Sequence, residues 1–447
     1  MTPLKYIIIL CAASIVLLQR DGWRCPGARK IISCGSALCC QLAKANKKDE
    51  VMTTPTVIAF IPGTTASEIM GAAGGTAIWP GILDADLADK TAWATELDTI
   101  TKLPVGNLVA EYTPSLTCYA SLLNYMSTGS NFADGVNFTS YVYNSASKNA
   151  IVPAADYLFY MIPYDWRQDD GAGSPSSAQW VADAITQLNN SFGKAGVTEY
   201  NLYLVAHSMG GLICRYILEA TSPGWSKHVR KLITLGTPHL GAPLALAPIL
   251  GEKFSSENAA EALFLQTMIN NASHPSTYEL LPPPAAANFI AEASASPSGM
   301  AYSLYDSSDA AFNAALAEWG LKRDVLKDAN NNLFSYLKYG DTATPVAYYC
   351  MAGTGLETLT SYLYIAGARS ASAAFVPQWT ASGGDGVVPQ ASASFETSTA
   401  PTVTTFAGYN HGQLAGSDMA KFPACIEHVL GTLIGVPLAA TAERSTR

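Results

Sequence analysis

Residues 200–216 read YNLYLVAHSMGGLICRY, and this stretch decides the fold. Its first part, Leu202–Val205, is a short apolar run typical of a buried parallel strand. Two glycines follow, and apolar residues from Leu212 onward recur at helical spacing. The stretch therefore predicts a strand, a sharp turn and a helix, with Ser208 at the corner. A nucleophile elbow requires this context, because the tight turn lifts the serine hydroxyl to the top of the sheet.

Ala206 stands where the usual G-x-S-x-G motif has its first glycine. The additional methyl group loosens the contact between strand and helix without forbidding it. A serine at the start of a helix is also a common N-cap. The motif alone therefore leaves two interpretations of Ser208 open, a capping residue and a catalytic nucleophile.

The composition favours a large globular protein. Of the 447 residues, 49% are hydrophobic and 14% are charged, so a sizeable core is possible. The net charge of −9 and the lack of a basic stripe argue against nucleic acid as a partner. The body of the sequence has no phosphate-binding glycine loop and no metal-site spacing of cysteine or histidine, so we expect neither a cofactor nor a metal.

Residues 1–45 differ from the rest and predict a secretory signal or an N-terminal anchor. Tyr6–Leu18 is an apolar run too short for a comfortable membrane span. A second apolar segment, Ile31–Leu42, leads into Ala43-Lys44-Ala45, which is similar to a signal cleavage site. We therefore assign residues 46–447 to the folded domain. We expect a protein of the secretory pathway that is secreted, lumenal as in a lysosome or vacuole, or held by the anchor.

Sequons and cysteines give weaker indications of secretion. N-glycosylation sequons begin at Asn137, Asn189 and Asn271. Of the four cysteines beyond the first 45 residues, Cys350 and Cys425 are the best candidates for a disulfide.

Hydrophobic patterning predicts strands that alternate with helices, which is typical of an α/β protein with a mostly parallel sheet flanked by helices. The expected strands lie at residues 56–61, 157–162, 202–205, 230–235, 345–351 and 402–406. The expected helices lie at residues 177–192, 259–268, 310–319, 325–337 and 420–433. Residues 242–344 break the alternation, so we expect a cap inserted there. Together with the elbow, this pattern predicts an α/β-hydrolase fold.

The loop after the first strand is the candidate oxyanion loop. The strand at residues 56–61 ends in the small-residue sequence 62–67. In an α/β-hydrolase one oxyanion-hole amide comes from such an early loop and the other from the residue after the nucleophile. The backbone amides of Thr64 and Met209 are therefore the expected donors.

The order of residues along the chain selects partners for Ser208. An α/β-hydrolase places the acid after the serine and the histidine after the acid. Asp385 lies in the glycine-rich loop GGDGVVP, and His411 follows the last expected strand. His239 precedes the acid, and His428 falls inside the closing helix. The sequence therefore predicts a catalytic triad of Ser208, Asp385 and His411.

In these motifs the chain resembles the lecithin:cholesterol acyltransferase family, which includes lysosomal phospholipases A and phospholipid:diacylglycerol acyltransferases. The segments that carry the resemblance are residues 61–63, 163–167, 207–211, 235–238 and 384–386, followed by His411. Among them PYDWR at residues 163–167 is the most specific, and we expect its Asp165 and Arg167 to form a buried pair that fixes a loop beside the pocket. Animal members carry a small disulfide near the lid, whereas residues 68–100 of this chain contain no cysteine.

The resemblance implies acyl transfer from a glycerolipid ester through an acyl-serine. Water as acceptor gives a phospholipase A or lipase, and an acceptor alcohol gives an O-acyltransferase. The expected partners are phospholipid or another acyl lipid, a membrane or lipoprotein surface and an acceptor alcohol. A carboxylesterase that acts on other esters and a non-catalytic lipid-binding protein are the alternatives.

Residues 68–115 follow the oxyanion loop directly and are the expected lid. No clean period of 2 or 3.6 runs through residues 71–81, although Ile78 and Trp79 are large and apolar. In related acyltransferases the matching region acts as a lid, so we expect Ile78 and Trp79 to contact lipid. In the alternative interpretation, Trp79 packs into the core beneath a static surface loop.

Overall fold

The computed structural model describes residues 54–83, 89, 92–93, 95–97, 103–113, 116–145, 151, 157–250, 274–286, 289–292, 301–305, 308–338, 346–395 and 401–439. The contacts between residues divide the chain into two units, Met1–Thr53 and Thr54–Arg447. All described residues belong to the second unit. The expected signal or anchor at residues 1–45 and the expected helix at residues 259–268 lie outside the described residues. Within the described part, no helix has the length and apolar character needed to cross a membrane.

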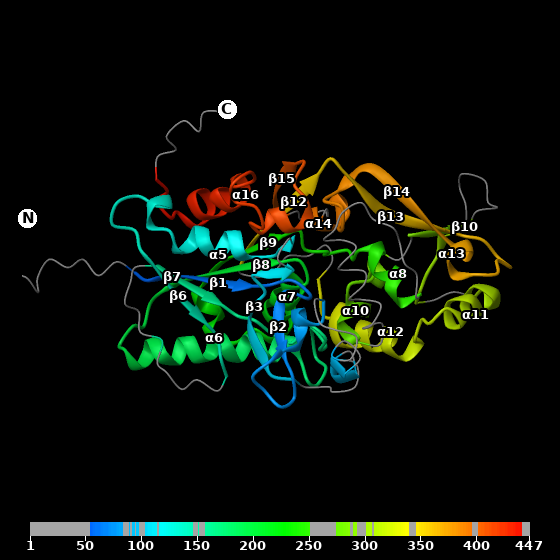
Figure 1. Ribbon diagram of the computed structural model, residues 1–447, viewed down its shortest axis with the longest axis horizontal. Coiled ribbons are helices and arrows are strands. Elements are labelled where there is room, and N and C mark those ends of the chain that lie inside the picture. The colour runs from blue at the N-terminus through cyan, green and yellow to red at the C-terminus, as the bar shows by residue number, and fades with distance from the viewer. Residues whose placement is uncertain are drawn as a thin grey trace, which may run out of the picture. The chain divides into compact units, whose positions relative to one another are not determined.

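A parallel sheet occupies the centre of this unit (Figure 1). Among the described residues it has seven strands in the order β15-β12-β9-β8-β1-β7-β6, and every neighbouring pair is parallel. The strands are β1 (Thr56–Ile61), β6 (Phe138–Val142), β7 (Tyr157–Met161), β8 (Asn201–His207), β9 (Val229–Leu235), β12 (Ala347–Thr354) and β15 (Thr402–Ala407). The central strands are apolar runs because a parallel sheet is buried on both faces.

The order of the strands creates a switch point beside β1. The chain enters at β1, runs through β6 and β7 on one side of it, and then crosses to β8 on the other side. From β8 it continues outward through β9, β12 and β15. Ligands of such sheets bind beyond the carboxyl ends of the strands at the switch point. The loops that follow β1, β7, β8, β9 and β15 all leave from this edge.

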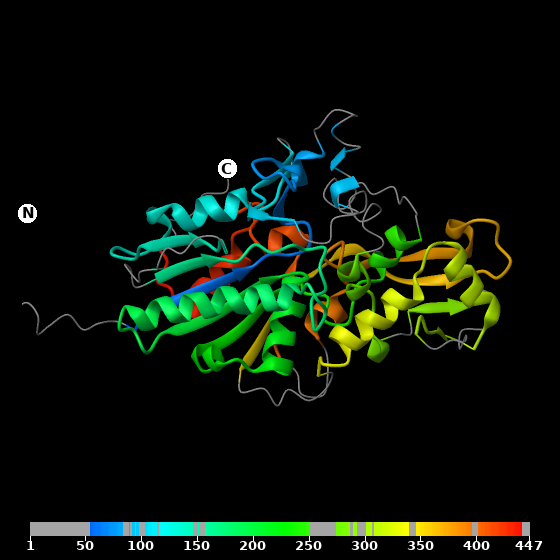
Figure 2. The same ribbon diagram turned by 90° about the horizontal axis from the view of Figure 1, so that it is seen from below.

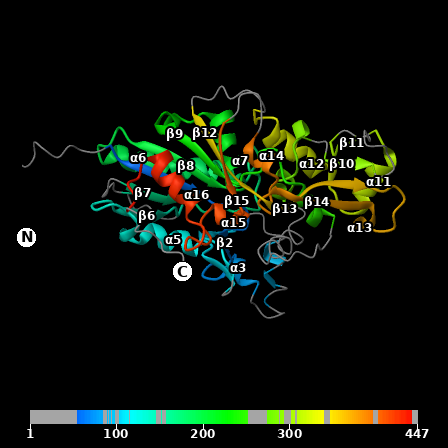
Figure 3. The same cartoon turned by 90° about the horizontal axis from the view of Figure 1, so that it is seen from above.

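Helices cover both faces of the sheet. In Figure 1, α6 (Ser177–Lys194) lies below the strands, and α5 (Ala120–Ser127) and α16 (Ala424–Glu427) lie above them. Figure 3, seen from above, shows α16 across the strands. The N-cap of α6 is Ser176, whose side chain accepts a hydrogen bond from the Gln179 amide. Its apolar positions Val181, Ile185 and Leu188 are fully buried. The side chains at i, i+4 and i+7 therefore supply the face that packs on the sheet.

A second, smaller sheet belongs to the cap and has the order β11-β10-β13-β14 (Figure 2). Its strands are β10 (Ile290–Glu292), β11 (Ala301–Tyr302), β13 (Leu356–Tyr364) and β14 (Phe375–Gly384). The hairpin of β13 and β14 comes from beyond the expected cap range of 242–344. It leaves the main sheet directly after β12 and pairs with β10 before the chain returns to the site.

The remaining elements are short. The other strands are β2 (Ser67–Met70), β3 (Val105–Leu108), β4 (Glu111–Thr113) and β5 (Leu116–Thr117), which form two small antiparallel pairs. The other α-helices are α3 (Ile78–Gly81), α7 (Gly210–Tyr216), α8 (Leu246–Ile249), α10 (Pro275–Glu279), α11 (Ala310–Glu318), α12 (Arg323–Ala329), α13 (Ala371–Ala374), α14 (Gln390–Ser394) and α15 (His411–Leu414). The 3₁₀-helices are η1 (Gly129–Asn131), η3 (Gly224–His228), η4 (Pro243–Ala245) and η5 (Pro284–Ala286). Among the described helices, three continue as π-helices, namely η2 (Ile217–Thr221), η6 (Asn330–Phe334) and η7 (His428–Ile434).

The predicted α/β-hydrolase architecture is confirmed. The strand expected at residues 56–61 is β1 with the same bounds, and the helix expected at residues 177–192 is α6 with two more residues. The sequence did not reveal β6 or the long β13–β14 hairpin. β6 is one of the two edge strands of the described sheet, and four of its five side chains are polar or only partly buried aromatic groups, so it lacks the apolar run of the central strands.

Two glycines allow α7 to start directly against the ends of β1 and β9. A Cβ atom on Gly210 would lie 2.5 Å from the Pro62 carbonyl oxygen and 2.7 Å from that of Ile61. A Cβ atom on Gly211 would lie 2.1 Å from Thr237 Oγ1. Because the obstacles to a Cβ at Gly210 include backbone atoms, they cannot move aside as a flexible side chain would.

Gly210→Ala should therefore lower the free energy of unfolding by at least about 3 kcal/mol, the upper end of typical overpacking penalties. Urea-induced unfolding provides the measurement. Gly193→Ala is the matched control, since a Cβ atom there meets nothing within 4 Å and the residue lies in α6. Alanine at Gly193 should be neutral or stabilising by up to about 1 kcal/mol. Equal stability of the two variants would contradict the close packing.

Candidate active site

Ser208 lies at the corner between β8 and α7 in a strained backbone conformation. Its φ angle is +53°, in the left-handed region that non-glycine residues seldom adopt. The side chain is 6% exposed, and the Ser208 amide donates a hydrogen bond to the Leu235 carbonyl at 2.9 Å. An N-cap serine has extended backbone angles, which these are not. The geometry is that of a nucleophile elbow.

His411 and Asp385 form a direct hydrogen bond. The distance from His411 Nδ1 to Asp385 Oδ2 is 2.8 Å, and the carboxylate is fully buried whereas the ring is partly exposed. A carboxylate only accepts, so His411 Nδ1 carries the proton of this hydrogen bond. The His411 amide also donates to the Asp385 backbone carbonyl at 3.0 Å. Two bonds, one of side chains and one of backbone, therefore join these loops.

The turn after β14 aims the Asp385 carboxylate. Its Oδ1 atom accepts hydrogen bonds from the amides of Val387 at 3.0 Å and Val388 at 2.7 Å. The amide of Gly386, which directly follows Asp385 in the chain, donates to Thr358 Oγ1 at 3.0 Å. One carboxylate oxygen is thus held by the backbone and the other is free for His411.

The His411–Asp385 pair lies beside Ser208. Gly236 lies against the pair, because a Cβ atom on Gly236 would lie 3.0 Å from both Asp385 Oδ2 and His411 Nδ1. Gly236 directly follows Leu235, whose carbonyl accepts from the Ser208 amide. Among the described residues, none forms a hydrogen bond with the Ser208 hydroxyl. Catalytic hydrogen bonds are often long in enzymes without substrate and tighten in the substrate complex.

The two expected oxyanion donors belong to segments that contact or directly follow Ser208. A Cβ atom on Gly63 would lie 2.9 Å from Ser208 Cβ, so the loop after β1 touches the elbow. Thr64 follows in that loop, and Met209 follows Ser208; both residues are buried. Within the described part of the chain, neither amide donates to a protein acceptor.

Aromatic side chains hold the oxyanion loop, residues 62–67, in place. Thr65 in this loop has a φ angle of +61°, a conformation that needs support from its surroundings. The described polar contacts are the Gly63 amide to Tyr119 Oη, Tyr164 Oη to the Pro62 carbonyl, Trp79 Nε1 to the Thr65 carbonyl, Tyr112 Oη with Thr65 Oγ1, and Trp166 Nε1 to the Ser67 carbonyl. Rigid rings with one polar end are suited to this role, because they fill the core and still bond the backbone.

Asp165 and Arg167 form a buried ion pair at the edge of this aromatic cluster. Arg167 Nε and Nη2 donate to the two carboxylate oxygens at 2.8 and 2.6 Å. Arg167 Nη1 also donates to the Leu97 carbonyl at 2.7 Å. The pair therefore ties the PYDWR loop to Leu97, within the segment expected to be a lid.

Ile78 and Trp79 do not contact solvent in the structure, contrary to the expectation of a lipid-contacting pair. Ile78 is 1% exposed and Trp79 is 2% exposed. The Trp79 ring packs edge-on against Trp166 with 5.5 Å between the ring centroids, and its Nε1 atom bonds the oxyanion loop. Burial is favoured because the indole N–H finds a backbone acceptor inside. The structure thus corresponds to the alternative interpretation, in which Trp79 packs into the core.

The expected disulfide is also corrected. Cys350 and Cys425 are both buried free thiols. Cys350 lies in β12 with its Sγ atom 3.6 Å from His239 Nε2, and burial raises its pKa to about 11. His239 bonds Thr234 Oγ1 at 3.1 Å and is likewise buried.

A buried acidic pair, which the sequence did not reveal, joins the core to the cap. Asp170 and Glu279 are both fully buried, and the Asp170 amide donates to Glu279 Oε2 at 2.7 Å. Among the described contacts, no hydrogen bond satisfies the Asp170 carboxyl oxygens or Glu279 Oε1. Burial raises the pKa of Asp170 well above its usual value, and the neighbouring Asp169 raises it further. Burial, followed by Asp170 and Asp169, raises the pKa of Glu279.

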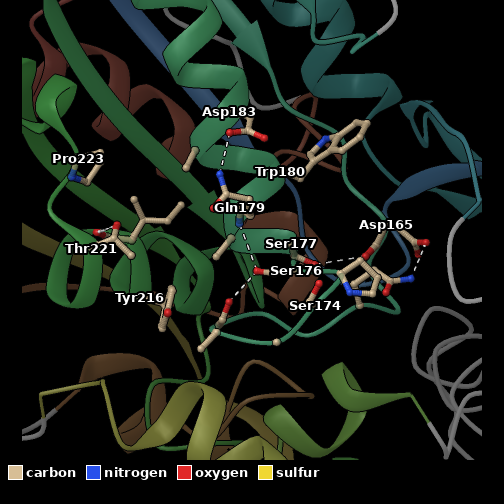
Figure 4. Close-up of a pocket in the computed structure, with 18 of the residues that line it drawn as sticks. Asp165, Ser174, Ser176, Ser177, Gln179, Trp180, Asp183, Tyr216, Thr221 and Pro223 are labelled. Atoms are coloured by element: carbon tan, nitrogen blue, oxygen red, sulfur yellow. Dashed lines mark hydrogen bonds between the residues drawn. The ribbon is translucent and has the colours of Figure 1, made fainter.

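A cavity of about 680 Å³ lies on the α6 side of the PYDWR loop (Figure 4). Figure 4 shows Ser176, Ser177 and Gln179 at the start of α6, with Tyr216 and Thr221 on the facing wall. None of the three expected triad residues lines this cavity.

Residues 139–333 match the family model of lecithin:cholesterol acyltransferase. The predicted resemblance to that family is confirmed. The matched range contains Ser208 and the Asp165–Arg167 pair, and it ends before Asp385 and His411. The match supports an enzyme that acts on lipid esters.

No curated protein matches the chain significantly. Similar solved structures include the Tle4–Tli4 complex, with 15% identity, a TM-score of 0.44 and coverage of 81% of this chain and 95% of that one. A mature lipase of Bacillus licheniformis has 13% identity, a TM-score of 0.30 and coverage of 87% and 95%. The phospholipase PlaB of Legionella pneumophila has 15% identity, a TM-score of 0.33 and coverage of 83% and 58%. No functional conclusion rests on these similarities, because all three TM-scores are below 0.5.

Trp79→Ala should remove about 3–5 kcal/mol of stability, the usual cost of a large aromatic cavity. Because Trp79 supports the oxyanion loop, hydrolysis of a soluble short-chain ester and of vesicle phospholipid should fall together. Trp93→Ala is the control, since Trp93 lies in the same segment and is only partly buried. Loss of vesicle activity alone, with an unchanged thermal midpoint, would restore the lid interpretation.

The acidic pair predicts a stability that falls as the pH rises. Since both folded-state pKa values are raised, the folded protein binds more protons than the unfolded chain above the ordinary carboxyl range near pH 4. Asp170→Asn removes one of these protons, so its stability relative to the unmodified protein should increase from pH 5 to pH 8 in urea unfolding. Asp328→Asn is the control, because that residue is exposed. An Asp170→Asn difference that is constant with pH would contradict the raised pKa.

Proposed function

We propose that the protein transfers the acyl group of a glycerolipid ester, with a phospholipid as the first candidate, through an acyl-serine on Ser208. The geometry at the carboxyl edge of the sheet supports this most directly: a strained, nearly buried serine lies beside a hydrogen-bonded pair of His411 and Asp385. The family match supports a lipid ester as the substrate class.

In the first step, His411 Nε2 removes the Ser208 hydroxyl proton while Oγ forms a bond to the ester carbonyl carbon. Asp385 accepts the hydrogen bond from Nδ1, which fixes the tautomer and stabilises the imidazolium. The tetrahedral intermediate collapses as His411 returns the proton to the departing lipid oxygen. The acyl group is then an ester of Ser208.

The developing negative charge needs donors on the carbonyl oxygen. The amides of Thr64 and Met209 are the proposed pair, since both lie next to Ser208 and lack protein acceptors within the described residues. A single donor of this kind contributes roughly 3–4 kcal/mol to transition-state stability in serine hydrolases.

In the second step, a hydroxyl group gives its proton to His411 and its oxygen attacks the carbonyl carbon of the acyl-serine. The bond from that carbon to Ser208 Oγ then breaks, and His411 returns the proton to Oγ. Water as acceptor releases a fatty acid, which is a phospholipase A or lipase reaction. An alcohol of a sterol, ceramide or diacylglycerol at a membrane or lipoprotein surface gives a new ester, which is an O-acyltransferase reaction. The balance depends on how far the site excludes water and admits the alcohol.

The direct test is labelling of Ser208 by a fluorophosphonate, followed by product analysis on phospholipid vesicles with and without an added alcohol. Ser208→Ala should abolish labelling and lower turnover by about 10⁴-fold or more. His411→Ala or Asp385→Ala should add little when combined with it, because the three residues act as one unit.

Ser222→Ala provides a matched control, because Ser222 has a φ angle of +42° and is exposed. It should retain labelling and turnover. Labelling that persists in Ser208→Ala, or a labelled protein that cleaves short-chain esters but no lipid, would contradict the proposal; the second result would favour a carboxylesterase.

A further inference from the structure

A chain of hydrogen bonds connects the oxyanion loop to His411 behind Ser208. The Gly63 amide donates to Tyr119 Oη at 3.1 Å, and Tyr119 Oη lies 2.7 Å from His207 Nδ1. On the other side of its ring, His207 Nε2 lies 3.1 Å from the His411 carbonyl oxygen. His207 directly precedes Ser208, so the chain passes along the elbow itself.

Only one arrangement of protons gives every donor in this chain an acceptor. The His411 carbonyl can only accept, so His207 Nε2 carries a proton. The Gly63 amide can only donate, so Tyr119 Oη receives that bond and directs its own proton to His207 Nδ1. If His207 carried protons on both nitrogens, the Tyr119 hydroxyl proton would have no acceptor among the described residues.

The surroundings agree with a neutral imidazole. His207 is 7% exposed and Tyr119 is 1% exposed. Burial lowers the pKa of His207 well below its usual value, and the neighbouring His411 ring lowers it further. The two rings lie 4.8 Å apart between centroids, so a charge on His207 would oppose the imidazolium that His411 forms during the reaction.

We infer that Tyr119 and His207 are positioning residues, which hold the oxyanion loop and the His411 loop in a fixed position relative to each other. They do so through hydrogen bonds that run from the Gly63 N–H to Tyr119, from Tyr119 to His207 and from His207 to the His411 carbonyl. The inference rests on the proposed function, since it assigns roles within that same site. It also explains why Thr64, and not Gly63, is the candidate oxyanion donor: the Gly63 amide is already committed to Tyr119. Neither side chain touches substrate in this account.

Tyr119→Phe tests the chain by removing one oxygen atom. It leaves the Gly63 amide and His207 Nδ1 without these partners, so the two loops are no longer held in a fixed position relative to each other. Turnover of a short-chain ester should fall about 10-fold or more in kcat, because small misplacements of catalytic groups are costly, while KM changes little. Tyr160→Phe is the matched control, since its equally buried hydroxyl donates to the Ala184 carbonyl at 3.1 Å, between β7 and α6.

Histidine variants separate positioning from simple packing. His207→Ala removes both bonds, whereas His207→Gln keeps an N–H near the position of Nε2 and can still donate to the His411 carbonyl. We expect His207→Gln to recover a substantial part of the kcat that His207→Ala loses. Equal kcat in Tyr119→Phe and Tyr160→Phe, or no recovery by glutamine, would overturn the inference while leaving the proposed function intact.

A spectroscopic readout tests the chain independently of activity. With nitrogen-15 labelled histidine, NMR of the unmodified protein should show His207 as the neutral Nε2–H tautomer at pH 6 to 8. Tyr119→Phe should shift the Nδ1 resonance of His207 while the fold is retained. A His207 that carries its proton on Nδ1, or that is doubly protonated at pH 7, would refute the chain. If the unmodified protein has no esterase activity, the proposed function fails and this arm still decides the hydrogen bonding.

Discussion

The strained backbone at Ser208 is the constraint on which the rest of the site depends. A serine at φ +53° is stable only where its surroundings fix it. Here the Ser208 amide bonds the end of β9, α7 begins at once through Gly210, and Gly63 approaches without a side chain. Each of these contacts requires a small residue or a parallel neighbour. Because β1, β9 and β15 run parallel in one sheet, the loops that follow them leave from the same edge, where the polar groups of the candidate site meet.

The loops at this edge are held mainly by side chains that are both large and polar-tipped. Tyr119, Tyr164 and Trp79 each have a buried ring, and the polar group of each forms a hydrogen bond with the backbone of residues 62–67. This solution avoids unsatisfied polar atoms in a loop that cannot form regular secondary structure. It also means that the segment expected to be a lid contributes to the support of the site, because Trp79 belongs to it. The buried Asp165–Arg167 pair continues that support to Leu97.

The sequence carried enough information for the sheet, the elbow and the order of the expected catalytic residues, because these depend on local patterns and on chain order. The apolar run before Ser208 and the glycines after it suffice to predict a strand, turn and helix. The environment of a side chain could not be predicted in this way. Whether Trp79 faces lipid or the core, and whether Cys350 reaches another thiol, depends on contacts between distant segments. Asp170 gave no signal at all, since its acidic partner lies more than a hundred positions along the chain.

The central claim is that Ser208, the two amides and the His411–Asp385 pair form one catalytic unit. A crystal structure of the protein after reaction with a fluorophosphonate tests it most directly. The account predicts phosphorus bonded to Ser208 Oγ, with its oxyanion-like oxygen about 2.7–3.1 Å from the amides of Thr64 and Met209. His411 should remain bonded to Asp385. Phosphorus on another side chain, or an oxygen turned away from both amides, would contradict the account.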